Sequence, residues 1–255
     1  MGGPPLREPS GSEERRVKSE RKPWFLGVAR WYARRRVASA FDGLFVHGLA
    51  EARQRVAAGP LIFAMNHVSW WDSFIVVLLD EALGAESHCL MDAQNLARLP
   101  FFGWIGAVPL RRANPREALV DLKASVDLLD RPGRILWIFP QGHQRPSHLR
   151  PLGLERGVSI LASDAKVDVV PVSLTYAFRE APQPSIAVNI GRPCSLRRSG
   201  PPEALEQSLV AGLDHNDELL TSGVGDYEAL VPPRSTGGVP LAGRFLARFG
   251  RGAHA

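Results

Sequence analysis

A histidine and an aspartate stand five positions apart in the stretch Asn66-His67-Val68-Ser69-Trp70-Trp71-Asp72, directly after the apolar run Leu61–Met65. Within one regular helix this spacing turns two side chains about 140° apart, because 3.6 residues make a turn. The two side chains meet only if His67 lies in the turn before a helix and Asp72 lies in its first turn. Asp72 can then hold one imidazole nitrogen while the other removes a proton from a substrate hydroxyl. The spacing predicts a general base oriented by a carboxylate.

The same segment has a purely structural interpretation. Ser69 and Asp72 match the capping-box pattern, in which the acidic side chain reaches back to a backbone N–H group at the start of a helix. From the local spacing alone, both interpretations of Asp72 remain open.

The stretch from Asn66 to Phe74 resembles the opening motif of the glycerolipid acyltransferases, N-H-x-S-x-x-D, with its defined positions intact. Three later segments, Phe102–Arg112, Phe139–Pro146 and Val169–Ser173, are similar to that family's other blocks in the same order. The resemblance implies an α/β fold, acyl transfer from a thioester and a membrane-associated acceptor. It covers about residues 44–173.

The resemblance also assigns roles to residues. His67 is expected to be the base, Asp72 its orienting carboxylate, and Arg112 a phosphate-binding cation. The backbone around Gly142, which has no side chain, is a candidate for acceptor or oxyanion contact. The alternative for Arg112 is an ordinary ion pair with an acidic residue. The expected substrate-binding residues are Asn66, Ser69, Arg112, Phe139, Pro140, Gln141, Gly142, Arg145 and Pro171.

The third block departs from the family pattern F-P-E-G-T-R-S. Gln141 stands where a glutamate is common, and an amide both donates and accepts, so it can contact an acceptor hydroxyl without carrying a negative charge. Gln144 takes the arginine position, which weakens a phosphate clamp unless Arg145 or His143 replaces it. A solvated loop position is the other interpretation of Gln141. These departures leave a non-phosphorylated acceptor open.

The elements that must position these residues follow from the apolar pattern. Helical patterns, the clearest capped by Asn114 and a later one over residues 205–220, alternate with short apolar runs. This alternation predicts a single α/β domain with a mixed, largely parallel sheet flanked by helices. The expected strands are Leu44–Val46, Leu61–Met65, His88–Met91, Ala107–Leu110, Ile135–Phe139, Val167–Tyr176 and Ile186–Ile190.

Basic charge is concentrated at the beginning of the chain. Residues 1–36 hold ten Lys or Arg and four Glu, a net charge of 10 − 4 = +6, whereas the whole chain carries +5. Aromatic and basic residues on one helix suit a membrane interface. We expect a disordered basic tail over 1–22, an amphipathic interfacial helix over 23–40, the acyltransferase domain over 41–225 and a flexible basic C-terminal tail over 226–255.

Two cysteines without metal-ligand spacing, and apolar runs too short to span a bilayer, favour a cytoplasmic protein held at the inner face of the cell membrane. An anionic membrane surface is the expected partner of the basic segment. We expect no nucleic-acid partner, no metal and no other cofactor. The oligomeric state is left open.

The function predicted from these features is transfer of a fatty acyl group from acyl-CoA or acyl-carrier protein to a hydroxyl group of a lysophospholipid. One alternative is O-acylation of a non-phosphorylated lipid, glycolipid or pigment. An alternative of another class is a non-catalytic membrane lipid-binding protein that keeps the fold.

Overall fold

Eight strands form one sheet in the part of the chain that the computed structural model describes, residues 20–179, 181–222 and 226–233. Their order is β4-β3-β5-β2-β6-β7-β1-β8. Neighbouring strands run parallel except β6 with β7 and β1 with β8. The predicted α/β fold with a mixed, largely parallel sheet is therefore confirmed.

Every apolar run that predicted a strand lies on one in the structure, with bounds shifted by a few residues at most. The strands are β1 (Leu44–His47), β2 (Leu61–Met65), β3 (Glu86–Asp92), β4 (Ala107–Leu110), β5 (Arg134–Ile138), β6 (Val169–Ala177), β7 (Ser185–Ile190) and β8 (Glu228–Val231).

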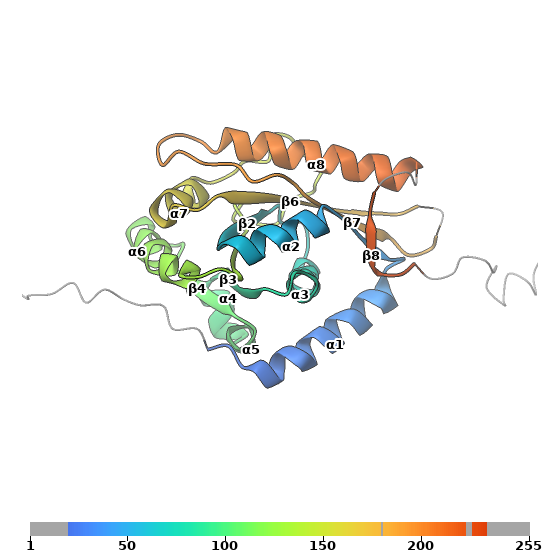
Figure 1. The fold of residues 1–255 in the computed structure, drawn as a ribbon, viewed down its shortest axis with the longest axis horizontal. Coiled ribbons are helices and arrows are strands. Elements are labelled where there is room, and N and C mark those ends of the chain that lie inside the picture. Colours follow the sequence, from blue (N-terminus) through green and yellow to red (C-terminus); the bar gives the residue numbers. More distant parts are fainter. Residues whose placement is uncertain (1–19, 180, 223–225, 234–255) are drawn as a thin grey trace, which may run out of the picture.

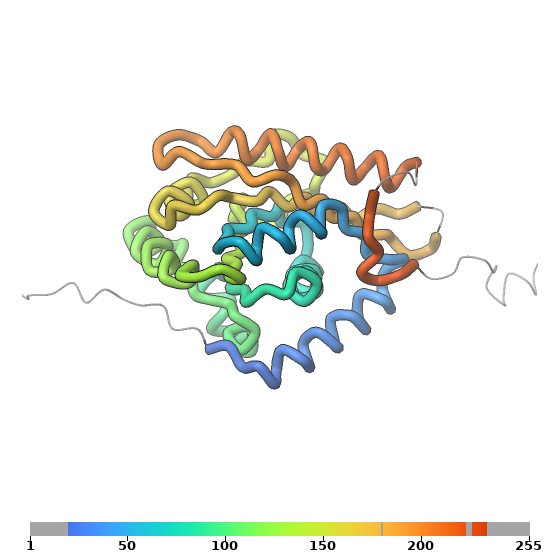
Figure 2. Tube along the Cα trace, viewed as in Figure 1, coloured from blue at the N-terminus to red at the C-terminus, as the bar shows by residue number. Residues whose placement is uncertain are grey.

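Helices cover both faces of the sheet (Figures 1 and 2). Apolar residues of α1, α2 and α3 pack in one core, and those of α6, η1, α7 and α8 pack in a second core on the other face. Short α4 and α5 connect β3 to β4. The helices are α1 (Pro23–Ala40), α2 (Leu49–Ala58), α3 (Asp72–Leu83), α4 (Ala93–Arg98), α5 (Phe101–Trp104), α6 (Pro115–Ser125), the 3₁₀ helix η1 (Val126–Leu129), α7 (Gly157–Ala165) and α8 (Glu203–Ser222).

Helix α6 begins where its capping residues predict. The side chain of Asn114 accepts a hydrogen bond from the Arg116 N–H group at 3.0 Å, and Pro115 occupies the first helical position. Proline is tolerated there because its missing N–H group has no partner within the first turn. The buried Leu122 then faces the second core.

The five strands β2 to β6 run in the same direction, so their carboxyl ends meet at one edge of the sheet. The segments that follow β2, β4 and β5 carry His67, Arg112 and Gly142. Open sheets of this kind bind ligands outside the carboxyl ends of their strands. The topology therefore brings together motifs that are far apart in the sequence.

Strands β3 and β5 diverge at this edge. Their pairing ends at Cys89 opposite Trp137, whereas β3 continues to pair with β4 as far as Asp92 opposite Leu110. The last residues of β3 thus leave β5 and follow β4. A space opens between the two strands on the side where the motifs meet.

The N-terminal helix has the predicted bounds, but residues 20–22 do not form part of a disordered tail. The Lys22 N–H group donates to the Trp104 carbonyl at 2.8 Å, and the Lys22 ammonium lies 4.1 Å from the centroid of the same indole. This segment therefore anchors the start of α1 on α5. Residues 1–19 lie outside the described part.

The expectation of a flexible tail over residues 226–255 is also wrong for its first residues. Glu228–Val231 form β8, which pairs antiparallel with β1 and completes the edge of the sheet. The Arg34 guanidinium of α1 donates to the Leu230 carbonyl at 2.8 Å, so the later part of α1 contacts β8. Four residues between short loops give too little periodicity for prediction from sequence. Residues 234–255 lie outside the described part.

Candidate active site

His67 and Asp72 meet as their spacing predicts. The His67 Nδ1 atom lies 2.7 Å from Asp72 Oδ2, and the carboxylate is fully buried. The same carboxylate accepts from the backbone N–H groups of Val68 at 2.7 Å and Ser69 at 3.1 Å, while Ser69 Oγ accepts from the Trp71 N–H group. One carboxylate therefore closes the turn that leads into α3 and also holds the imidazole, an arrangement consistent with both interpretations of Asp72.

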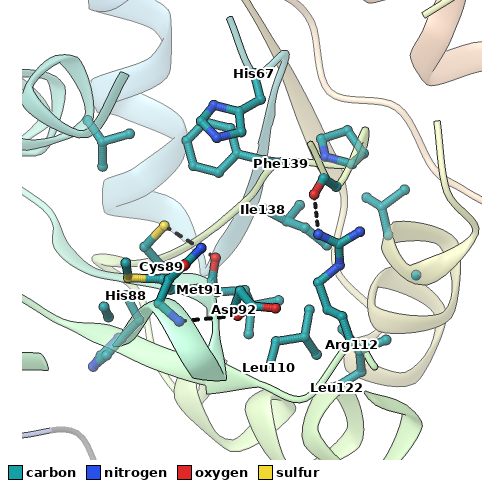
Figure 3. Close-up of a pocket in the computed structure, with 18 of the residues that line it drawn as sticks. His67, His88, Cys89, Met91, Asp92, Leu110, Arg112, Leu122, Ile138 and Phe139 are labelled. Atoms are coloured by element: carbon teal, nitrogen blue, oxygen red, sulfur yellow. Dashed lines mark hydrogen bonds between the residues drawn. The ribbon is translucent and has the colours of Figure 1, made fainter. Parts of the chain in front are cut away.

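The imidazole of His67 is fixed on two sides. Its Nδ1–H group donates to the buried carboxylate, which leaves Nε2 with a lone pair to accept a proton. The ring packs on Phe139 with centroids 4.5 Å apart. The side chain is 25% exposed and lines a large cavity, with Phe139 beside it in Figure 3.

The cavity has a volume of about 710 Å³ and occupies the space between the diverging ends of β3 and β5. Its size falls within the range of about 300–1,000 Å³ common for small-molecule sites. His67 lies at one end and Arg112 faces the cavity from the β4 side (Figure 3). Most of the wall is apolar, including Val76, Val77, Leu90, Phe102, Leu110, Leu122, Ile138 and Val158.

Arg112 forms the ion pair that its alternative interpretation predicts. Its guanidinium contacts Glu155 Oε1 at 2.9 Å and donates to the carbonyl of Gly142. Gly142 has φ +70°, a conformation that favours glycine, and a side chain there would also displace the ends of Arg112 and Glu155. The Gly142 N–H group already donates to the Phe139 carbonyl at 3.0 Å, so this one N–H group is engaged within the loop.

The neighbouring Arg111 is engaged elsewhere. It donates to Asp121 from its backbone N–H group and from its guanidinium, the latter at 2.6 and 2.9 Å. Arg111 thus ties β4 to α6, and Arg112 is the arginine of this pair that lines the cavity.

Gln141 is buried, so its interpretation as a solvated loop residue is wrong. Its Oε1 atom accepts from the His67 N–H group at 2.7 Å, and its Nε2 atom donates to the Leu152 carbonyl at 3.1 Å. Both ends of the amide hold backbone groups, and Gln141 does not line the cavity. A glutamate here would bring a carboxylate oxygen against the Leu152 carbonyl, which explains why an amide suits this site.

Four other expected substrate-binding residues also hold the framework. Asn66 exchanges two hydrogen bonds with Leu174 at 2.7 and 2.9 Å, and the Arg145 N–H group donates to the His67 carbonyl at 2.8 Å. Pro171 lies within β6, and the Ser69 hydroxyl holds the turn before α3 by accepting from the Trp71 N–H group. None of these residues lines the cavity. The expected residues that do line it are His67, Arg112, Phe139, Pro140 and Gly142.

Two residues of the site lie outside the four motif segments and could not be predicted from them. Glu155 lies 43 residues from Arg112, and Tyr176 donates its hydroxyl to Asp72 Oδ1 at 2.8 Å from 104 residues away. Neither belongs to a short pattern with its partner. Only the three-dimensional arrangement identifies them.

Other titratable groups on the cavity wall are poorly suited to catalysis. Burial raises the pKa of the Cys89 thiol to about 12, so it stays protonated at neutral pH and is a weak nucleophile. Burial and the positive charges of Arg21 and Arg134 lower the pKa of His88 to about 4. Burial raises the pKa of Asp80 to about 6, where Ser87 and Trp137 donate hydrogen bonds to it.

Residues 43–175, just over half of the chain, match the model of the Acyltransferase family. The chain therefore belongs to the Acyltransferase family, and all four motif segments lie in the matched part.

The chain is 29% identical over 154 residues to the 1-acyl-sn-glycerol-3-phosphate acyltransferase of Saccharomyces cerevisiae, over 57% of this chain and 48% of that protein. It is 28% identical over 120 residues to a chloroplastic 1-acyl-sn-glycerol-3-phosphate acyltransferase of Brassica napus, over 45% of this chain and 33% of that protein. A chloroplastic enzyme of the same name from Arabidopsis thaliana is 29% identical over 119 residues, covering 45% and 32%. The matches thus span half or less of each relative.

Among the described helices, none combines the length and the hydrophobicity needed to cross a bilayer.

Proposed function

We propose that this protein transfers a fatty acyl group from a thioester, acyl-CoA or acyl-carrier protein, to the free hydroxyl of a lysophospholipid of the 1-acylglycerol-3-phosphate class. The observation that carries the proposal is the His67–Asp72 pair at one end of a largely apolar cavity that Arg112 also lines. The names of the similar proteins support this choice of acceptor.

The geometry of His67 supports the following reaction. Its Nε2 atom takes the proton of the acceptor hydroxyl as the hydroxyl oxygen attacks the thioester carbonyl carbon. The tetrahedral intermediate collapses to the ester, the carbon–sulfur bond breaks, and the imidazolium returns its proton to the leaving thiolate. The buried carboxylate of Asp72 stabilises the imidazolium during both steps.

Arg112 is the proposed contact for the acceptor phosphate. An exposed ion pair contributes little to the stability of the fold. Because Glu155 is 56% exposed, a phosphate can displace its carboxylate from the Arg112 guanidinium. Bidentate binding of phosphate oxygens is a strong arrangement for an arginine.

Replacing Arg112 tests the choice of acceptor. Arg112→Gln should raise KM for a phosphorylated lysolipid by about 10- to 100-fold, the effect of losing a charge-assisted hydrogen bond, and should leave KM for an uncharged monoacylglycerol nearly unchanged. Steady-state kinetics with one acyl donor measure both values. Arg53→Gln on α2, whose guanidinium donates to Ala82, is the matched control. An equal loss with both acceptors would contradict a phosphate contact.

The Arg112–Glu155 pair also favours a second candidate function, acylation of an uncharged lipid hydroxyl. In the described structure a carboxylate occupies the place proposed for phosphate, and the Arg145 guanidinium donates to the Leu152 carbonyl. An enzyme that acylates an uncharged lipid and no phosphorylated lysolipid under the same donor would replace the first proposal with this one.

A peripheral position on the inner face of the cell membrane is the proposed location. Trp24, Val28 and Trp31 follow one another at helical spacing on α1 and are 65%, 51% and 63% exposed. Tyr32 contacts Phe74 at 5.9 Å between ring centroids, and Phe74 contacts Trp70 at 4.9 Å.

Trp70 joins this exposed surface to the site because it is 55% exposed and lines the cavity with His67. A bilayer in contact with the outer side of α1 would therefore lie beside the cavity. Arg34, Arg35 and Arg36 are exposed near the end of α1 and supply attraction to anionic headgroups.

Replacing the two exposed tryptophans tests the membrane surface. Trp24→Ser with Trp31→Ser should weaken liposome binding by about tenfold or more, because large apolar side chains lose their burial in the interface. Co-sedimentation with neutral and anionic vesicles over a salt series measures it. Val120→Ser, an exposed apolar position on α6, is the control. Unchanged binding would remove α1 from the membrane surface. Deletion of α1 is a poor test, because Ala33 and Val37 are buried in the core.

A further inference from the structure

A phenol on β6 contacts the carboxylate that orients the base. The hydroxyl of Tyr176 donates to Asp72 Oδ1 at 2.8 Å, whereas His67 Nδ1 lies against Oδ2 of the same carboxylate. We propose that Tyr176 is a positioning residue for the acyl transfer reaction, acting through Asp72 on His67. This inference rests on the proposed role of His67 as base.

The phenol completes a set of donors around both carboxylate oxygens. Oδ2 accepts from His67 and from the backbone N–H groups of Val68 and Ser69, and Oδ1 accepts from Tyr176 at 2.8 Å and more weakly from Ser69 at 3.2 Å. The hydrogen bond from the Tyr176 hydroxyl is therefore the shorter of the two described bonds that hold Oδ1. Without it, the carboxylate has more freedom to rotate, and the imidazole that follows it loses its fixed direction.

Tyr176 is itself fixed by elements outside the turn that carries His67. It pairs with Ile186 in the β6–β7 ladder, and its ring packs on Phe41, at the end of α1, with centroids 5.5 Å apart. Phe41 also packs edge-on against Trp71 at 4.9 Å. The hydroxyl thus links the Asp72 carboxylate to the sheet. The other described donors to this carboxylate come from residues 67–69 of its own segment.

The phenol can only donate in this arrangement. Burial and the neighbouring carboxylate of Asp72 raise the pKa of Tyr176 far above its ordinary value, so the hydroxyl keeps its proton at any working pH. Asp72 and His67 are the titratable groups joined to it by described hydrogen bonds, and Arg36 of α1 lies over the Trp71 ring at 5.4 Å. Tyr176 therefore does not take part in proton transfer.

The test is Tyr176→Phe, which keeps the ring and removes the hydroxyl. We expect kcat to fall about tenfold with little change in KM, the order expected for a lost hydrogen bond to a charged group. The acidic limb of the kcat/KM profile should move to higher pH. The reason is that Asp72, with one donor fewer, holds a more concentrated negative charge and stabilises the imidazolium more strongly.

Tyr227→Phe is the matched control, because Tyr227 donates its hydroxyl to Asn216 at 3.0 Å and takes no part in the cavity. It should leave kcat and the pH profile unchanged. A wild-type kcat and pH profile in folded Tyr176→Phe protein would overturn the proposal while leaving the role of His67 intact.

A second measurement separates positioning from packing. In a His67→Ala background, Tyr176→Phe should cause no further loss, because no imidazole remains to be oriented. The same tenfold loss there would show that the hydroxyl acts on the fold alone and would overturn the proposal. High activity in His67→Ala itself would instead contradict the proposed function.

If Tyr176→Phe does not fold, 3-fluorotyrosine at position 176 keeps the hydroxyl and makes it a stronger donor. The acidic limb of the profile should then move to lower pH, the reverse of the effect of removing the donor. An unmoved limb would overturn the proposal.

Discussion

His67→Ala is expected to lower kcat by about 10²- to 10⁴-fold, the usual contribution of a positioned general base. The loss should be confined to activity, because the contacts that hold this turn are made by the backbone. The His67 N–H group donates to Gln141, and its carbonyl accepts from the Arg145 N–H group. Both remain when the imidazole is removed.

Initial rates of thioester consumption with a lysophospholipid acceptor measure this effect, and circular dichroism with thermal unfolding verifies the fold. His215→Ala, on the distant α8, is the matched control and should retain wild-type rates. Near-normal turnover in folded His67→Ala protein would show that another group accepts the proton.

Asp72→Asn is expected to be as severe, with kcat lower by about 10³- to 10⁴-fold, the size of the loss when the aspartate of a catalytic triad becomes an amide. The amide nitrogen can donate to Nδ1 of His67 and so favours the tautomer whose Nε2 carries the proton and cannot act as a base. It also meets the backbone N–H groups of Val68 and Ser69, donor against donor.

The same substitution should therefore lower stability as well as activity. Loss of the acceptor for the part-buried N–H groups of Val68 and Ser69 costs about 1–3 kcal/mol. Denaturant unfolding and steady-state kinetics measure the two effects separately. The control is Asp168→Asn. The Asp168 carboxylate accepts a hydrogen bond from Ser195, and neither residue lines the cavity. If Asp72→Asn lowers stability and leaves kcat unchanged, the carboxylate only holds the turn before α3.

The first motif could be predicted in detail because its geometry is local. A strand, a tight turn and a helix start lie within Leu61–Asp72, and the spacing of His67 and Asp72 allows contact in one arrangement only. The strands and α6 were predictable for the same reason, since burial and capping leave regular patterns over a few residues.

The rest of the site depends on contacts between distant segments. Whether Gln141 faces the acceptor or the backbone of His67 is decided by the position of Leu152, which a single sequence does not contain. The ion pair of Glu155 with Arg112 and the hydrogen bond of Tyr176 to Asp72 likewise arise from the order of the parallel strands. The residue types indicated the chemistry of the site, and the topology of the sheet determined which side chains line the cavity.

The same distinction explains the expected substrate-binding residues that hold the framework. The resemblance covers a motif as a whole, but the side chains of Asn66 and Gln141 do not line the cavity and instead bond to the backbone of Leu174 and His67. Membership of a motif thus indicates that a residue matters to the site. It does not tell whether the residue contacts the substrate or supports another residue that does.

The most direct test of the central claim follows both products of one reaction. Purified protein is incubated with an acyl-CoA and 1-acylglycerol-3-phosphate, free thiol is measured spectroscopically, and the diacylated lipid is measured by mass spectrometry. The account predicts one diacylated lipid for each thiol released by the wild-type protein, with both products nearly lost in His67→Ala. Thiol release without the diacylated lipid, or equal product from the wild type and His67→Ala, would contradict it.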